Sequence, residues 1–461
     1  MKIGNGWECD LLTAIINLFL IILTGSCNDS KISDKKNNSL DEVKYKSQLN
    51  WMGHYYLDEK SRYYLMKEVE REFRLRNQEV DLKLVFAKEI TDDWTKENEF
   101  IVSIVKSGNY KFDIIDMEPG RYNQVGGLLN DPEWGRKYLV DFSDSSWFKK
   151  RHKSIIYDDK RIRQSTGNMM TSPYIEGIFS CLWINTRVLA QIGGSLKQSN
   201  LTIRDIHDLI DKVKTYNATS QNKIAPLDIE RGWDSYYDLF RMLFMSAYFQ
   251  ETSEEGKMDA GIKAVKRVAE ELEYLQKQSQ LKNPKYWEHF GDKAIFKDKA
   301  LIGVYPSFAF VQWQNVDSVE VLKLVPCELP IFEHDSKYYP GHYQGVYGVL
   351  KKSPNVENAI KLIKYLCSES VAERWLMYSK SPTGLKTRIT SSDFDQNNYD
   401  KFYNYINKKY PNTIYDFDPM IIAFGAKYNS KYTVRFKDNI YKVLFGEMTA
   451  KEYMSQFQKL K

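Results

Sequence analysis

Apolar positions that alternate or repeat at helical spacing predict an α/β unit in the first part of the chain. Residues 80–87 alternate as a strand, and apolar residues at 64, 65, 69 and 73 indicate a helix over 62–76. Strands at 48–52 and 112–117 and a helix at 97–106 complete an alternating order. This order predicts a parallel sheet with right-handed crossovers. Ligands of such sheets bind beyond the carboxyl ends of the strands.

A second α/β unit is predicted after residue 167. Its apolar strand, 178–184, runs into Asn185-Thr186-Arg187, where a helix follows. In the next helix Thr202 and Asp205 form a capping box ahead of apolar positions at helical spacing. Further helices are predicted over 233–249 and 261–278. The pattern therefore favours at least two α/β units in one chain.

The residue pattern at the N-terminus indicates where in the cell the protein is located. A largely apolar run of about 14 residues, 11–24, suits a signal peptide and is too short to span a bilayer as a helix. Small residues before Cys27 and the polar stretch after it resemble the lipobox of bacterial lipoproteins. We therefore expect residues 1–26 to be a signal peptide and Cys27 to carry lipid. A cleaved signal with an incidental Cys27 and an uncleaved anchor are the alternatives.

Residues 27–47 are rich in Lys, Asp, Asn and Ser and are expected to form a flexible tether on the lipid anchor. The whole chain of 461 residues, 43% of them hydrophobic, is long enough to bury a large core. A net charge of +5 without blocks of like charge gives no indication of nucleic-acid binding.

Cysteine usage does not favour a disulfide framework or a zinc ribbon. Only Cys181, Cys327 and Cys367 remain after Cys27, without regular spacing. Each lies in apolar surroundings and is expected to be a buried thiol, although one pair could still form a disulfide outside the cytoplasm. The aromatic content of 14% is high, and aromatic faces pack in cores and also bind sugar rings.

Several segments in a fixed order resemble the extracellular solute-binding proteins of ABC importers, the family that includes maltose and other oligosaccharide binders. They cover most of residues 48–385, and their order and spacing together carry the resemblance. The segments are Phe112 to Asp116, Leu182 to Leu189, Ile192 to Gly194 with Leu201 to Lys214, Phe296 to Ser307, Leu329 to Phe332, Gly345 to Val349, Ser353 to Leu366 and Pro382 to Gly384.

The resemblance implies an α/β fold of two lobes, joined by a hinge, with a cleft between them. We expect the N-lobe at 45–158 plus 330–370 and the C-lobe at 159–329 plus 371–461. It also implies an extracytoplasmic protein, lipid-anchored to the bacterial cell membrane, that captures a small molecule and delivers it to the membrane subunits of an ABC permease. A carbohydrate is the favoured ligand, and no cofactor or metal is expected.

A sugar site needs an aromatic face against the C–H surface of the ring and polar side chains for the hydroxyls. Candidates lie at predicted strand ends and near the segments that resemble the family. From the N-lobe these are His54, Tyr55, Glu89 and Asp116, with Tyr347 from the returning segment; from the C-lobe they are Tyr174, Trp233, Asp234, Tyr305, Ser307 and Trp313. Core packing is the alternative for Trp233, helix capping is the alternative for Asp116, and Trp183 is expected in the core.

Enzyme classes find little support. The chain has no nucleophile-elbow, zinc-protease, phosphate-loop or dinucleotide-binding pattern. His334, His342 and Asp335 match no standard metal spacing. A glycosidase that uses Glu89 and Asp116 as its two carboxylates stays a rival interpretation. A surface lipoprotein that holds glycans or proteins without transport is the third.

Overall fold

The computed structural model describes the chain in segments. These are residues 47–53, 60–91, 93–108, 111–117, 119–151, 169–172, 175–197, 199–229, 235–254, 256–281, 289–336, 338–344, 347–388, 397–410 and 439–457. They form a mixed α/β protein with two sheets, each the centre of one lobe.

The N-lobe is built on a four-stranded sheet of order β2-β1-β3-β9. Strand β1 pairs in parallel with β2 and β3, and β9 joins β3 in the antiparallel sense. The elements of this lobe are β1 (Ser47–Gly53), α2 (Lys60–Arg76), β2 (Val80–Phe86), α3 (Ala87–Ile90), α4 (Trp94–Ser107), β3 (Ile114–Asp116), α5 (Pro119–Leu129), α6 (Trp134–Tyr138), α7 (Ser146–Arg151), β9 (Tyr347–Val349), α14 (Val356–Leu366) and α15 (Glu369–Ser379).

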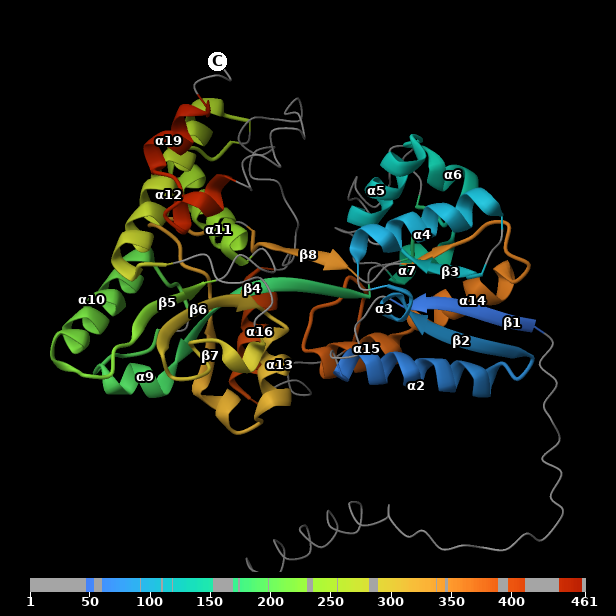
Figure 1. Cartoon of the computed structure of the whole chain (residues 1–461), viewed down its shortest axis with the longest axis horizontal. Helices are drawn as coiled ribbons and strands as arrows, with labels where there is room; N and C mark the ends of the chain where they lie inside the picture. Colours follow the sequence, from blue (N-terminus) through green and yellow to red (C-terminus); the bar gives the residue numbers. More distant parts are fainter. Residues whose placement is uncertain are drawn as a thin grey trace, which may run out of the picture. The chain divides into compact units, whose positions relative to one another are not determined.

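Each face of this sheet carries its own apolar core. Trp51 and Ile114 face a core with α2, α14 and α15, while Met52 and Ile115 face a second core with α4, α5 and α6. Neighbouring residues of one strand point to opposite faces, so the two cores follow directly from the strand period. In Figure 1 the orange α14 and α15 lie beside the blue β1, β2 and α2, although they are far apart in sequence.

The C-lobe is built on a sheet of order β5-β6-β4-β7, with β8 paired to the start of β4. All ten residues of β4 are buried. The elements of this lobe are β4 (Glu176–Asn185), α9 (Thr186–Gln191), α10 (Ile203–Thr219), β5 (Ala225–Ile229), α11 (Ser235–Glu251), α12 (Met258–Ser279), η2 (Phe290–Asp292), β6 (Ala300–Pro306), α13 (Ala309–Val316), η3 (Glu320–Lys323), β7 (Leu324–Cys327), β8 (Gly341–Gln344), α16 (Asn398–Lys409) and α19 (Ala450–Ser455).

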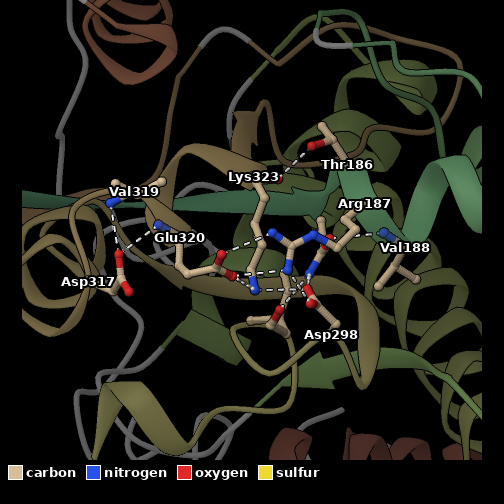
Figure 2. A network of polar contacts seen from close by, with 10 residues as sticks. Thr186, Arg187, Val188, Asp298, Asp317, Val319, Glu320 and Lys323 are labelled. Atoms are coloured by element: carbon tan, nitrogen blue, oxygen red, sulfur yellow. Dashed lines mark hydrogen bonds and ion pairs between the residues drawn. The ribbon is translucent and has the colours of Figure 1, made fainter.

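An ion-pair network fixes the carboxyl end of β4. Asn185 accepts the Val188 N–H at 3.0 Å and so caps α9, and its Nδ2 donates to Asp298 at 2.7 Å. Arg187 pairs with Asp298 at 2.6 Å and with Glu320 at 3.0 Å, and Figure 2 shows these side chains converging with that of Lys323. The network ties α9, the turn before β6 and η3 together at the surface of the C-lobe.

Three segments of the chain connect the lobes, and hydrogen bonds join two of them to the start of β4 and the third to β9. Met169, Met170 and Ile175 pack in the N-lobe cores just before β4, β8 precedes β9, and residues 380–385 follow α15. Strand β8 pairs with β4 from Glu176 to Phe179, and Gly177 N donates to Pro382 O at 2.5 Å. Ser172 N donates to Tyr347 O at 2.7 Å. These crossings give the hinge a shared hydrogen-bonded frame.

At two points the chain passes from one lobe to the other later than at the expected boundaries, 330 and 370. Ile331 belongs to the C-lobe core because its N–H bonds to Leu201 O at 2.9 Å, beside the start of α10. Val371 and Trp375 belong to the N-lobe core because α15 packs against α2. The segment just after β7 therefore stays in the C-lobe, and α15 stays in the N-lobe.

Candidate functional site

The carboxyl ends of β1, β2 and β3 meet at one edge of the N-lobe sheet, since these strands run parallel. Strand β1 ends at Gly53, where a Cβ atom would lie 2.8 Å from a methyl carbon of Leu84. The absence of a side chain at Gly53 thus allows the end of β1 to pack closely against the side chains of β2. The candidates His54 and Tyr55, which come next in the chain, lie outside the described residues, as do Tyr174, Trp233 and Asp234.

Glu89 lies at this edge, on the short helix α3 that directly follows β2. Its side chain is exposed, and one carboxylate oxygen accepts the Phe86 N–H at 3.4 Å. Among the described residues, its other carboxylate oxygen has no hydrogen-bond partner and could accept a hydrogen bond from a ligand hydroxyl group. Its role in binding a ligand stays a prediction.

Asp116 ends β3 and is fully buried beside an arginine. Its carboxylate lies 3.1 Å from Arg121 Nε, and the same guanidinium lies 2.5 Å from Glu97 and 3.3 Å from the amide oxygen of Asn98. Arg121 itself is 1% exposed, and its buried guanidinium pairs with both carboxylates. Asp116 therefore fixes the turn after β3, and its role in binding a ligand stays a prediction.

The indole of Trp94 covers this ion cluster. The guanidinium carbon of Arg121 lies 3.9 Å from the indole centroid, and Trp94 Nε1 donates to Gln124 Oε1 at 2.8 Å. Trp94 is the first residue of α4, which Asp93 caps by accepting the N–H groups of Thr95 and Lys96. Sequence reasoning missed this residue. The available indication was an N-capping Asp followed by an aromatic residue just after a predicted strand.

The described C-lobe candidates are packed into its core. Tyr305 and Trp313 are 0% exposed, their ring centroids 5.5 Å apart, and Trp313 Nε1 donates to Phe290 O at 3.0 Å. Ser307 is also buried, and its N–H donates to Phe179 O at 2.6 Å. In this structure these three side chains have no solvent-accessible face. Their role in binding a ligand stays a prediction.

Tyr347 occupies the N-lobe core rather than its edge. Its ring packs edge-on against Trp51 at 5.5 Å, and its side chain is 0% exposed. The Tyr347 N–H donates to Ser172 Oγ at 2.9 Å, which joins two of the segments that connect the lobes. The role of Tyr347 in binding a ligand stays a prediction.

A buried ion pair lies where both lobes contribute side chains. Arg62 of α2 donates from Nε to both Glu176 carboxylate oxygens, at 2.8 and 3.1 Å, and Trp375 Nε1 donates to Glu176 Oε2 at 3.0 Å. Arg62 also lies 5.1 Å from the ring centroid of Phe308, which follows β6. Sequence analysis missed this cluster, since its members are far apart in the chain.

Metal ligands, membrane-spanning helices and free thiols are the other features of functional interest. Within the described segments, no group of three or more His, Cys, Asp or Glu side chains could hold a metal ion. Among those segments, no helix is both long and apolar enough to cross a membrane. Cys181, Cys327 and Cys367 are free and buried, and burial raises the pKa of each thiol.

Solved structures with the same fold were found, whereas no protein-family model and no curated protein sequence matches the chain. A sugar transporter protein of Rhizobium etli in an open conformation is 14% identical, with a TM-score of 0.60 over 89% of this chain and 98% of that one. The GacH receptor of Streptomyces glaucescens, solved unliganded and with acarbose, is 14% identical, with a TM-score of 0.59 over 89% and 96%.

A sugar transporter protein of Bacillus licheniformis in complex with stachyose is 15% identical, with a TM-score of 0.56 over 89% of this chain and 98% of that one. Others among the similar solved structures are named as binding proteins. The chain thus has the two-lobed α/β fold of ABC-transporter solute-binding proteins, as expected from the sequence.

Proposed function

We propose that this protein is an extracytoplasmic solute-binding protein that captures a carbohydrate between its two lobes and delivers it to an ABC permease. The observation that carries the proposal is the fold, which matches sugar-binding transport proteins over 89% of this chain and nearly all of theirs. The N-lobe adds a strand edge with an exposed carboxylate, Glu89, and a partly exposed indole, Trp94.

The connections between the lobes suit capture by closure. Two lobes joined by a few short segments can rotate about those segments and enclose a ligand. Only contacts that differ between open and closed states shift this equilibrium, so the ligand must touch both lobes. Strand β8 and Pro382 both bond to the start of β4, and Ser172 bonds to Tyr347 of β9. These connections can therefore act as one hinge.

A binding role without catalysis is the simpler interpretation of the two candidate carboxylates. Glu89 is exposed, whereas Asp116 is fully buried and held by Arg121. A glycosidase needs two carboxyl groups that both reach the scissile bond. The buried position of Asp116 argues against that role.

The N-terminal part of the proposal rests on the sequence. Residues 1–26 would be a signal peptide, Cys27 the lipidated N-terminus, and residues 27–47 a tether. Tethering a receptor raises its effective concentration at a permease in the same membrane. Mass spectrometry of the mature N-terminus tests this step: a diacylglyceryl adduct on Cys27 is expected, and an unmodified Cys27 would leave a freely diffusing binding protein.

Thermal-shift screening of the full chain against a library of neutral mono- and oligosaccharides tests the central step. A bound sugar stabilises the native state by about 2.7 kcal/mol when its free concentration is 100 times Kd, so the melting temperature should rise. Small-angle scattering with each positive sugar should show a smaller radius of gyration. Absence of any shift across the library would refute carbohydrate capture, and release of shorter sugars on incubation would indicate a hydrolase instead.

A further inference from the structure

The inner face of the Trp94 indole is occupied by a fixed cation. The guanidinium carbon of Arg121 lies 3.9 Å from the indole centroid, within the range of a cation–π contact. Arg121 cannot move away easily, because Glu97 at 2.5 Å and Asp116 at 3.1 Å hold it and its side chain is 1% exposed. The orientation of the indole plane is therefore set by a buried ion cluster.

The polar edge of the indole is fixed as well. Trp94 Nε1 donates to Gln124 Oε1 at 2.8 Å, and Asn98 Nδ2 donates to the same oxygen at 2.5 Å. Since both partners are donors, the amide oxygen of Gln124 must be the acceptor, and this defines the position of its Nε2 group. Gln124 is exposed, and within the described segments its Nε2 has no hydrogen-bond acceptor. A rigid amide donor thus adjoins the indole.

These side chains lie where the N-lobe sheet offers a ligand site. Trp94 begins the helix that follows β2 and α3, and Arg121 lies in α5, which follows β3. Strands β2, β1 and β3 run parallel, so both helices start from the carboxyl edge of the sheet. Trp94 remains partly exposed there, although it packs on Arg121.

We propose that Trp94 is the aromatic platform on which one sugar ring of the ligand stacks, with Gln124 Nε2 donating to a hydroxyl of the same ring. This inference rests on the proposed function and names a residue for it. The outer indole face would contact the C–H surface of a neutral pyranose. Because Arg121 and Gln124 already fix the ring, stacking costs little side-chain entropy.

The competing interpretation is that Trp94 only shields Arg121 from water. A shield would matter for stability and not for affinity. A matched control is available in Trp147 of α7, which is also partly exposed and has a lysine, Lys364, 5.9 Å from its centroid. Trp147 packs with Phe142 and Phe148 in the core on the other face of the sheet. Replacing it removes an indole without touching the strand edge.

The experiment uses the full chain and isothermal titration with raffinose, stachyose, D-tagatose and every neutral sugar that raises the melting temperature. We expect Trp94→Ala to weaken binding at least tenfold, Trp94→Phe to retain most affinity, and Trp147→Ala to bind like the unmodified protein. Sugar should also change the tryptophan fluorescence of the unmodified protein by a component that Trp94→Phe lacks.

The outcomes separate this inference from the proposed function. If the unmodified protein binds a sugar and Trp94→Ala binds it equally, the platform is refuted and carbohydrate capture stands. Equal losses in Trp94→Ala and Trp147→Ala would also refute the platform, since they would report general destabilisation. If no sugar binds the unmodified protein, carbohydrate capture fails and the platform fails with it. Melting temperatures without sugar show whether each variant is folded.

Discussion

Removing one partner of the Arg62–Glu176 ion pair should destabilise the protein strongly. Both side chains are almost completely buried, at 4% and 0% exposure, and Glu176 also accepts the Trp375 Nε1 proton at 3.0 Å. Arg62→Met removes the cation of this pair, and Glu176→Gln removes its anion. An unpaired buried charge costs about 3–5 kcal/mol, so each single variant should lose about that much.

The double variant, Arg62→Met with Glu176→Gln, removes both charges together. Its loss should therefore be no larger than that of either single variant, and the sum of the single losses should exceed it by about 3 kcal/mol. Urea unfolding of all four proteins, followed by tryptophan fluorescence and circular dichroism, gives the free energies of unfolding and this coupling energy.

A more exposed ion pair for comparison joins α2 to α15. Arg374 NH2 lies 2.9 Å from the Glu72 carboxylate, and both side chains are about a quarter exposed, at 24% and 23%. Because water screens this pair, Arg374→Met should cost only about 0.2–1 kcal/mol. The prediction is refuted if the stability losses of Arg62→Met and Glu176→Gln are additive in the double variant. It is also refuted if either single loss is as small as that of Arg374→Met.

Three further results are expected from the structure. Gly303→Ala should lower the free energy of unfolding by about 1–3 kcal/mol, because the new Cβ atom would lie 2.8 Å from the ring of Tyr305. In α5, the Cβ atom of Gly127→Ala would meet no atom within 4 Å, so this variant should raise the free energy of unfolding by about 0.5–1 kcal/mol. Urea unfolding measures both changes. Hydrogen bonds from Arg187 and Lys323 lower the pKa of Glu320 from 4.5 to about 2. This carboxylate therefore stabilises the fold above pH 4.5 and loses that effect as the pH falls towards 2, so the urea midpoints of the unmodified protein and Glu320→Gln should differ at pH 6 and converge at pH 2; a constant difference would contradict this. The buried thiols of Cys181, Cys327 and Cys367 should resist alkylation in the native protein and react after unfolding, as peptide mass mapping can show. Modification of any of them in the native state would contradict their burial.

The sequence predicted the regular elements well where one face of an element is apolar. The strand expected over 80–87 is Val80–Phe86, and the helix expected over 261–278 is Met258–Ser279. The capping box of Thr202 and Asp205 is confirmed by both of its hydrogen bonds, and Trp183 is a core residue, as predicted. These features are local, since a strand period or a cap involves residues only a few positions apart.

The lobe boundaries and the polar clusters were less accessible from the sequence. Whether residues 371–385 pack on α2 or in the C-lobe depends on tertiary contacts, and the apolar face of α15 suits either environment. Arg62 and Glu176 are 114 positions apart, and neither lies in a motif. Trp94 and Arg121 were missed for the same reason: only the parallel pairing of β1 with β2 and β3 brings them together.

The antiparallel strand β9 has a consequence for the order in which the protein folds. β9 (Tyr347–Val349) completes the N-lobe sheet beside β3 (Ile114–Asp116), and the whole C-lobe sheet is encoded between them. A chain made from its N-terminus must therefore leave the edge of β3 unpaired until the described C-lobe strands, β4 to β8, have been made. Long-range pairing of this kind slows folding. In hydrogen-exchange pulse labelling during refolding, we expect the amides of β4 and β6 to become protected before those of β3 and β9.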